Sequence, residues 1–280
     1  MRRFAVIGYP IGHTMSPFIH KRLFELSGMP ADYDVIEISP GELESRIPTL
    51  KVLDGFNITI PHKTGIIPFL NSIDGTARLY GSVNTVRCNG EFKGYSTDGT
   101  GFLKALESGD VPLSGRIVIM GCGGVVRTIA FEAAKRGCDI CFAVRDADLS
   151  ACEVLKNEIF SFKPDSDIGI TSLDGIKGEI DLLINGTPVG MYPSINAMPM
   201  PGEALVNTKR IFDAVYNPED TLFIKTAREM GVKTVGGMPM LVWQAAAAHE
   251  IWDGVSYNVE DINAIIREAN KYMNESFGGI

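Results

Sequence analysis

The sequence predicts an α/β protein with two domains, and three observations support this prediction. Segments typical of strands alternate with segments typical of helices, which is the pattern of parallel sheets covered by helices. The chain has 280 residues, which is long for a single hydrophobic core. The segment Gly109–Gly115, which contains Pro112, separates two series of such elements and is the expected boundary.

The first series is expected to begin with a short buried strand, and Ser16-Pro17 then predicts the start of a helix that continues to Leu26. Serine favours the N-cap and proline the first helical position, and Ser39-Pro40 repeats this signal. Asn89-Gly90 predicts a tight hairpin between Val83–Cys88 and Glu91–Tyr95. The other expected elements are strands at Phe4–Gly8, Tyr33–Ile38 and Gly55–Thr59 and a helix at Asp98–Ser108.

The second series repeats the alternation of strands and helices. Strands are expected at Arg116–Met120, Asp139–Val144, Ile168–Ser172, Asp181–Ile184, Arg210–Asp213 and Val232–Val235. Helices are expected at Gly123–Arg136, Ser150–Phe162, Thr221–Met230, Met240–Trp252 and Val259–Met273.

Composition narrows the function. The net charge of -8 disfavours nucleic acid and anionic membrane surfaces as partners, since both attract basic proteins. No apolar run is long enough for a membrane span, and glycines and a proline interrupt the apolar start as they would not in a signal peptide. Five cysteines without framework spacing indicate reduced thiols and a cytoplasmic protein. Cys138 and Cys141 form a CxxC inside an expected strand, where they point to opposite faces, so we interpret them as structural.

A glycine-rich turn, Gly121-Cys-Gly-Gly124, lies between an expected strand and an expected helix. This is the context of a Rossmann-type dinucleotide turn, in which the backbone approaches a pyrophosphate at the helix N-terminus. The next strand ends in Arg145-Asp146. Arginine there favours the extra phosphate of NADP, whereas Asp146 would repel it if its side chain points inward. Alternatively, Arg145 is a solvated loop residue.

Polar residues follow the strands of the first series, where carboxyl ends of parallel strands converge on one crevice. They are Thr14, Ser16, Asn57, Thr59, Lys63, Asn84 and Asp98. Thr14 and Ser16 offer hydroxyls at a helix N-terminus, which suits a carboxylate. Lys63 and Asp98 carry opposite charges that could meet. Each has a structural alternative: Ser16 or Asp98 as a helix cap, and Lys63 as a surface lysine.

The four histidines are interpreted as structural: His13, His20, His62 and His249. No histidine or cysteine spacing resembles a metal site, and no metal is expected.

Over nearly its whole length and in order, the sequence resembles the shikimate dehydrogenase family. The segments that carry the resemblance are GYPIGHTMSPFIH (8–20), FNITIPHK (56–63), GSVNT (81–85), GYSTDG (94–99), GCGG (121–124), VRD (144–146), INGTPVGMYP (184–193), FDAVYNP (212–218) and GGMPMLVWQAA (236–246).

The resemblance implies a discontinuous substrate and catalytic domain of residues 1–108 and 238–280, with an NADP-binding domain of 109–237 between them. It implies Lys63 and Asp98 as the catalytic pair. The implied substrate residues are Thr14, Ser16, Asn57, Thr59, Asn84, Tyr216 and Gln244. The implied cofactor residues are Gly121, Gly123, Gly124, Val125, Arg145, Ala214 and Gly237.

The sequence also departs from the family pattern. The family usually has serine at Thr14, asparagine at Ser96 and a small residue at Val126, and its NADP clamp has a second basic residue where Asp148 stands. The implied cofactor is therefore NADP, with NAD usable as well.

The implied reaction is the reversible, NADPH-dependent reduction of 3-dehydroshikimate to shikimate, on the route to chorismate and the aromatic amino acids. Three alternatives remain at this stage. They are a dehydrogenase acting on quinate or an amino analogue with NAD or NADP, a non-catalytic ligand sensor, and a tetrahydrofolate-type dehydrogenase. The expected partner is a small-molecule substrate, and the expected state is a monomer or homodimer.

Overall fold

The structure is a computed structural model that describes residues 1–12 and 14–277. His13, which was interpreted as structural, and the last three residues of the predicted substrate domain lie outside the described residues. By its internal contacts the chain forms two compact units, Met1–Gly101 with Val242–Ala269 and Phe102–Leu241 with Asn270–Ile280. The division falls inside three continuous helices, α5 (Asp98–Ser108), α9 (Gly237–Asp253) and α10 (Val259–Phe277). The boundaries at 108 and 238 stay a prediction.

Unit 1 is built on a six-stranded mixed sheet with the order β2-β1-β3-β5-β6-β4. The strands are β1 Arg2–Gly8, β2 Ala31–Glu37, β3 Gly55–Ile58, β4 Ser72–Ile73, β5 Thr85–Arg87 and β6 Lys93–Tyr95. β1 pairs in parallel with β2 and β3, but β3 and β5 are antiparallel. The expectation of a parallel sheet is therefore wrong for β5 alone, which runs antiparallel to both neighbours as the predicted hairpin requires, whereas β6 and β4 pair in parallel.

The predicted hairpin forms, but its turn is wider than the two residues expected. Arg87 pairs with Lys93, so residues 88–92 all belong to the connection. Phe92 explains the difference: its ring is buried beside Phe56, and its backbone N–H donates to Asn71 Oδ1 at 3.0 Å. Burial of this ring competes with the tight turn that Asn-Gly favours.

The helices of unit 1 confirm one start signal and correct the other. Those that lie wholly within the unit are α1 Ser16–Ser27, α2 Leu43–Leu50, α3 His62–Gly65 and α4 Gly75–Tyr80. Ser39 and Glu42 form a capping box ahead of α2. The N-cap of α1 is Met15, and Ser16 is already helical, so the prediction of Ser16 as N-cap is wrong by one residue. Thr14 Oγ1 instead accepts from the Ser16 N–H at 3.2 Å.

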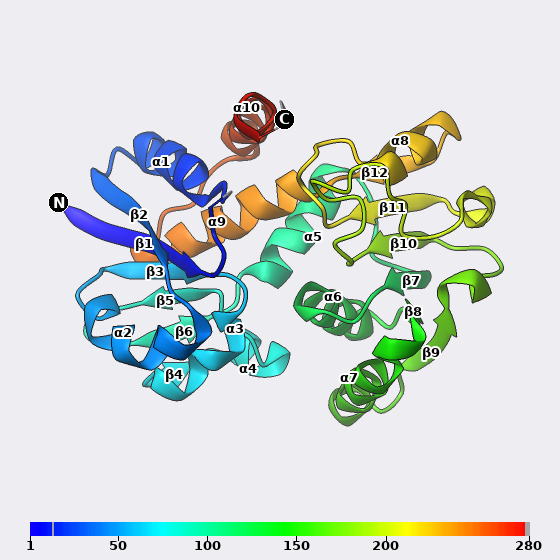
Figure 1. The fold of residues 1–280 in the computed structure, drawn as a ribbon, viewed down its shortest axis with the longest axis horizontal. Helices are drawn as coiled ribbons and strands as arrows, with labels where there is room; N and C mark the ends of the chain where they lie inside the picture. The colour runs from blue at the N-terminus through cyan, green and yellow to red at the C-terminus, as the bar shows by residue number, and fades with distance from the viewer. Residues whose placement is uncertain (13, 278–280) are drawn as a thin grey trace. The chain divides into compact units, whose positions relative to one another are not determined.

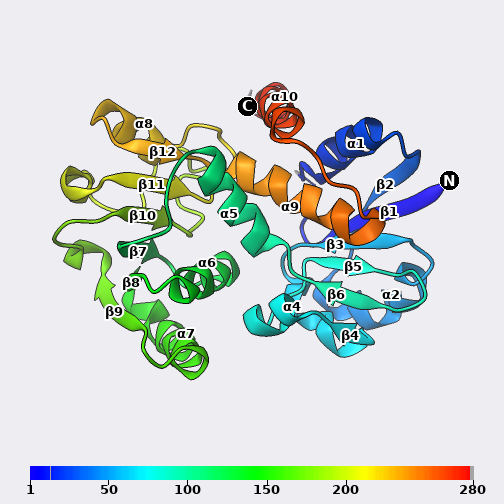
Figure 2. The ribbon, with the colours of Figure 1, turned by 180° about the vertical axis from the view of Figure 1, so that it is seen from behind.

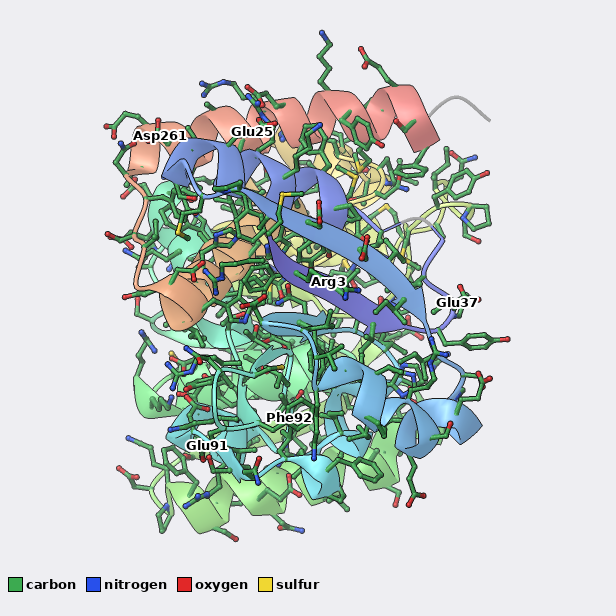
Figure 3. The ribbon with its side chains drawn as sticks, turned by 90° about the vertical axis from the view of Figure 1, so that its left-hand side faces the viewer. Arg3, Glu25, Glu37, Glu91, Phe92 and Asp261 are labelled. Atoms are coloured by element: carbon green, nitrogen blue, oxygen red, sulfur yellow. The ribbon has the colours of Figure 1, made fainter. Side chains whose placement is uncertain are left out.

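The C-terminal helices return to pack on unit 1, as the resemblance implied. The C-terminal end of α9 lies against β1 and β3 in both views (Figure 1, Figure 2). The Trp252 ring packs on Phe4 at 4.6 Å, and its Nε1–H donates to Val86 O at 2.9 Å. Gly55 leaves room for it, since a Cβ there would lie 2.4 Å from Trp252 Nε1. The first part of α10 (Val259–Phe277) lies beside α1 (Figure 3).

Unit 2 is built on a six-stranded parallel sheet with the order β12-β11-β10-β7-β8-β9. Its strands are β7 Arg116–Met120, β8 Asp139–Val144, β9 Asp167–Ser172, β10 Leu182–Asn185, β11 Arg210–Asp213 and β12 Lys233–Val235, and its helices α6 Gly124–Lys135, α7 Leu149–Phe162 and α8 Leu222–Glu229. These predictions are confirmed to within a residue at each end. The strand order reverses between β7 and β10, which is where parallel sheets of this kind bind dinucleotides.

Short 3₁₀ turns connect several of these elements, at Pro40–Glu42, Ile67–Phe69, Asp146–Asp148, Leu173–Gly175 and Gly202–Asn207. Among the described residues, none of the helices combines the length and the apolar character that crossing a bilayer requires.

Candidate active site

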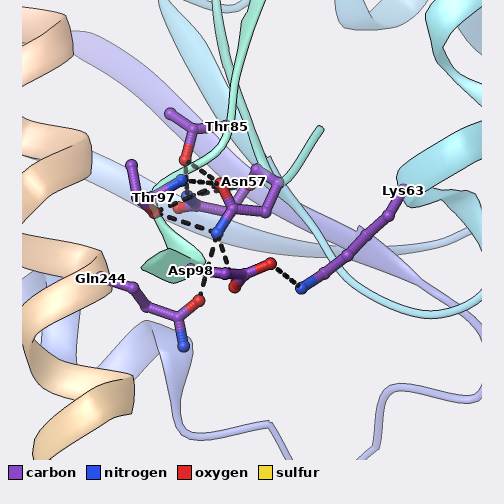
Figure 4. Close-up of polar contacts among 7 residues, drawn as sticks. Asn57, Lys63, Thr85, Thr97, Asp98 and Gln244 are labelled. Carbon is purple, nitrogen blue, oxygen red and sulfur yellow. Dashed lines mark hydrogen bonds and ion pairs between the residues drawn. The ribbon is translucent and has the colours of Figure 1, made fainter. Parts of the chain in front are cut away.

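The predicted catalytic pair meets in unit 1. Lys63 lies on α3, directly after β3, and Asp98 is the first residue of α5. Lys63 Nζ lies 2.7 Å from Asp98 Oδ2 (Figure 4). The Asp98 side chain is only 6% exposed, whereas the Lys63 side chain is 28% exposed. The ammonium is therefore anchored on one side by a buried carboxylate and remains accessible on the other.

Asn84 holds the carboxylate of this pair in place. Its Nδ2 donates to Asp98 Oδ1 at 2.9 Å, and Gln244 Oε1 lies 3.2 Å from the same nitrogen. Its Oδ1 accepts from the backbone N–H of Thr97 at 2.9 Å. Both oxygens of Asp98 are thus engaged, so the carboxylate has one fixed orientation. Figure 4 shows these contacts converging from β3, α3, the loops around β5 and β6, and α9.

Asn57 is fixed by a second set of contacts, which includes a residue that sequence reasoning missed. The Tyr33 hydroxyl donates to Asn57 Oδ1 at 2.7 Å, and Asn57 Nδ2 donates to Thr85 Oγ1 at 3.1 Å. Burial raises the pKa of Tyr33 well above its usual value, although a hydrogen bond with Ser16 opposes the shift. An aromatic residue between Asp32 and Asp34 in a period-two strand was the available signal for an inward-facing side chain.

Thr14 and Ser16 lie together at the N-terminus of α1. The Thr14 hydroxyl donates to Ser16 Oγ at 3.2 Å. The two hydroxyls, at the positively polarised end of a helix, can therefore face one anion. Thr59 follows β3, and its methyl group lies 2.4 Å from where a Cβ on Gly8 would be, so only glycine fits beside it.

The histidines of unit 1 that the structure describes are all buried. His62 Nε2 lies 2.6 Å from Ile38 O, so it ties α3 to the end of β2 rather than facing the crevice. His20 and His249 contact each other. Within residues 1–12 and 14–277, no three His, Cys, Asp or Glu side chains gather as metal ligands would.

In unit 2 the glycine turn borders a pocket of about 270 Å³. Gly121 has a φ of +98° and a Cβ there would meet Thr187, so the turn requires glycine. Gly123 caps α6 and Gly124 begins it, and a Cβ on either would meet nothing within 4 Å. Packing does not demand these two glycines. Their bare backbone at a helix N-terminus fits the pyrophosphate of a dinucleotide. Val125 follows in the first turn.

Val126 takes the position where such turns usually have a third small residue. Its side chain is fully buried, and a Cβ on Gly186 would lie 2.3 Å from Val126 Cγ2. The small residue needed for close packing of helix and sheet is therefore supplied by Gly186, after β10. This exchange explains why the turn tolerates valine.

At the end of β8, the acidic side chain beside the predicted clamp residue Arg145 is that of Asp148 and not that of Asp146. Asp148 lines the pocket together with Arg145, whereas Asp146 is exposed in the 3₁₀ turn. Arg145 Nε lies 2.8 Å from Asp148 Oδ2. The 3₁₀ turn Asp146–Asp148 reverses the backbone, so the Asp148 carboxylate lies beside the Arg145 side chain.

Ala214 and Gly237 are neighbours in unit 2. A Cβ on Gly237 would lie 2.5 Å from Ala214 O, and Gly237 N–H donates to Val215 O at 3.1 Å. Asp213, which sequence reasoning missed, organises this loop: it accepts from Asn185 Nδ2 at 2.9 Å and from the Val215 N–H at 3.0 Å. Burial raises the pKa of Asp213 to about 6.

Tyr216 lies in the same loop of unit 2, whereas the other predicted substrate residues belong to unit 1. Burial raises the pKa of its hydroxyl.

Comparisons with known proteins agree with this arrangement. Residues 6–86 match the model of the shikimate dehydrogenase substrate binding domain. The chain is 37% identical to a shikimate dehydrogenase (NADP(+)) of Methanocaldococcus jannaschii, over 95% of this chain and 96% of that protein. A shikimate 5-dehydrogenase from Thermus thermophilus, solved with NADP(H) and shikimate, is 31% identical with a TM-score of 0.86, covering 96% of this chain and 100% of that one. A shikimate 5-dehydrogenase from Listeria monocytogenes, solved with shikimate and NAD, is 30% identical with a TM-score of 0.86, covering 95% and 96%.

Proposed function

Because this chain belongs to the shikimate dehydrogenase family of NADP-dependent oxidoreductases, we propose that it catalyses the reversible reduction of 3-dehydroshikimate to shikimate with NADPH, in aromatic amino acid biosynthesis. The observation that carries the proposal is the Lys63–Asp98 pair, fixed by Asn84 and open to solvent on the lysine side. A sensor of shikimate would need a binding pocket but no anchored acid.

Lys63 is the acid and base of the proposed reaction. The nicotinamide cofactor supplies the hydride that reduces the ring ketone. The Lys63 ammonium hydrogen-bonds the ketone oxygen, stabilises the negative charge that develops there, and donates the proton. In the direction of oxidation Lys63 must begin neutral to accept the hydroxyl proton, so oxidation of shikimate is favoured at alkaline pH.

Asp98 and Asn84 position Lys63 in this mechanism. A lysine side chain has four rotatable bonds, and the 2.7 Å contact with Asp98 restricts Nζ to one region. Since both Asp98 oxygens are already hydrogen-bonded, the carboxylate cannot rotate away when substrate arrives. Much of the rate enhancement then comes from holding the acid against the reacting oxygen.

The substrate carboxylate binds at Thr14 and Ser16. Asn57, Thr59 and Asn84, which all belong to unit 1, supply donors and acceptors for the ring hydroxyls. Gln244 belongs to the proposed substrate site because it contacts Asn84. The resemblance implies Tyr216 as a further substrate residue.

The cofactor binds in unit 2. The turn of Gly121, Gly123, Gly124 and Val125 would hold the pyrophosphate, and Arg145 would pair with the 2′-phosphate of NADP. The resemblance implies that Ala214 and Gly237 would border the nicotinamide. The contact between Arg145 and Asp148 weakens this clamp, so NADP is preferred by a modest margin and NAD is also used.

We further propose a cytoplasmic enzyme, a monomer or homodimer. The five free cysteines support a reducing compartment.

Initial rates with shikimate and with quinate, each with NADP and NAD, test the proposal directly. We expect shikimate with NADP to have the highest kcat/KM. A higher kcat/KM for quinate would replace the proposed substrate, and absence of turnover with all four pairs would favour a ligand sensor. Lys63→Met is the matched inactive control.

A further inference from the structure

Two buried histidines that the proposed mechanism does not use contact each other behind the substrate site. His20, on α1, is 2% exposed, and His249, on α9, is 0% exposed. His20 Nδ1 lies 3.1 Å from His249 Nε2, and His249 Nδ1 lies 2.9 Å from the Tyr257 hydroxyl oxygen. That hydroxyl donates to Leu23 O at 3.0 Å. The contacts start on α1, cross α9 and return to α1.

The contact between Tyr257 and Leu23 determines which atom donates and which accepts in every hydrogen bond of this series. Leu23 O can only accept, so it takes the single hydroxyl hydrogen of Tyr257. The Tyr257 oxygen must then accept from His249 Nδ1–H. His249 Nε2 is consequently an acceptor, and His20 Nδ1–H donates to it. This order requires the His249 imidazole to be neutral, because it donates from one nitrogen and accepts at the other. Burial lowers the pKa of His20 well below its usual value and that of His249 to about 3, which agrees.

Simple packing does not explain this arrangement. Two apolar side chains of similar volume would fill the same core without the cost of removing four ring nitrogens from water. The hydrogen bonds give something that apolar side chains do not, namely a defined rotation for each ring. The series of hydrogen bonds therefore determines the orientation of the His20 ring.

Tyr33 links the His20 ring to the proposed substrate site. It stacks on the Tyr33 ring with centroids 4.2 Å apart and an angle of 8° between the planes. Tyr33 in turn donates to Asn57 Oδ1 at 2.7 Å. His20 lies four residues after Ser16, so both occupy the same face of α1 and both contact Tyr33.

We propose that His20 and His249 are positioning residues: their hydrogen-bonded chain holds the His20 ring against Tyr33 and so holds the Tyr33 hydroxyl on Asn57 in the substrate site. The inference rests on the proposed function, because it takes Asn57 to contact shikimate. It predicts that disturbing the chain weakens shikimate binding while NADP binding stays unchanged.

Three variants distinguish the effect of the His20 ring from the effect of its hydrogen bond to His249. His20→Ala removes the ring that supports Tyr33, and we expect the KM for shikimate to rise about five- to ten-fold, the value of one hydrogen bond. His249→Leu leaves the His20 Nδ1–H without a partner, so the ring turns and the KM rises similarly. His20→Phe keeps a ring beside Tyr33 but loses the hydrogen bond to His249 Nε2, so the KM for shikimate should rise by less than in His20→Ala; a KM equal to the wild type would show that the hydrogen bonds are not needed. The KM for NADP should not change in any of the three.

Ile19→Ala is the control for lost stability alone. Ile19 is equally buried on the same helix but lies one residue from His20, on another face. It should lower Tm and leave the KM for shikimate unchanged. A second control combines His249→Leu with Tyr33→Phe. Because the histidines act through the Tyr33 hydroxyl, His249→Leu should no longer change the KM once that hydroxyl is absent.

Each outcome decides the inference. Variants that lose Tm as Ile19→Ala does and keep their KM for shikimate would show that the histidines only fill the core. An equal KM increase in His20→Phe and His20→Ala would exclude the stacked ring as the route. If a variant does not fold, nitrogen NMR of the wild type remains: Nε2–H tautomers at both histidines would overturn the chain. Failure of the proposed function is separate, since the wild type itself would then not oxidise shikimate.

Discussion

Ser16→Ala distinguishes substrate binding from helix stability at the N-terminus of α1. Sequence alone leaves two accounts of Ser16, a helix cap and a carboxylate ligand. In the structure Met15 is the N-cap of α1, and Ser16 is already the first helical residue. The variant should therefore change binding rather than stability.

The size of each effect follows from the contacts of Ser16. A neutral hydroxyl that bonds a charged carboxylate contributes about 1.5–3 kcal/mol. Ser16 Oγ already accepts from Thr14 in the free protein, and that contact remains available as substrate binds, so we expect the lower end. This corresponds to an increase of about ten-fold in the KM for shikimate. Alanine is favourable in a helix, but the variant loses the long contact with Thr14 and the hydrogen bond with Tyr33, so Tm should fall by no more than about 4 °C.

The assay compares shikimate with its methyl ester. The wild type should use the ester poorly, because the ester has no charge for the Thr14 and Ser16 hydroxyls to bind. Ser16→Ala should narrow the ratio of kcat/KM between acid and ester, and the KM for NADP should stay constant. Thermal unfolding is measured on the same samples.

A Ser16→Ala enzyme that melts early but keeps its KM for shikimate would refute this reasoning. The hydroxyl would then stabilise the helix in spite of its position, and the carboxylate site at Thr14 and Ser16 would be lost. Much of the case for shikimate over a neutral ketone would fall with it.

Three further predictions concern the acid, the cofactor and pH. Lys63→Met should lower kcat by about two to four orders of magnitude with little change in KM, as removal of a general acid does, and steady-state rates within a few-fold of wild type would contradict it. Arg145→Ala should abolish the preference for NADP over NAD. Asp148→Asn should increase that preference about three-fold or more, because it removes the carboxylate that competes for Arg145. If the wild type and both variants had the same ratio of kcat/KM for NADP to kcat/KM for NAD, Arg145 would not bind the 2′-phosphate. Since burial lowers the pKa of His20 well below its usual value and lowers the pKa of His249 to about 3, the unfolded chain binds protons below about pH 6.5 that the folded protein does not bind. The free energy of unfolding should then fall from pH 6.5 toward 3, by up to about 1.4 kcal/mol per pH unit for each histidine, and urea unfolding at pH 6.5 and 4.5 should show a smaller difference in His249→Leu.

Much of the fold could be predicted because its signals are local. The strands of unit 2 are short apolar runs between turn residues, and the glycine turn lies between β7 and α6 where a positive φ at Gly121 requires glycine. Lys63 and Asp98 could be proposed because each lies in a motif at the end of a strand. Patterns of this kind depend on residues a few positions apart, which the sequence displays directly.

The tertiary structure decided what depends on distant residues. Burial of Phe92 widened the hairpin, and the antiparallel β5 made the first sheet mixed. Asp148 rather than Asp146 faces the pocket because the 3₁₀ turn rotates it there. Neither Asn84 between Asp98 and Gln244 nor Tyr33 on Asn57 has a signature in neighbouring positions. The direction of a side chain depends on packing between elements far apart in the chain, and that packing sets the chemistry of the site.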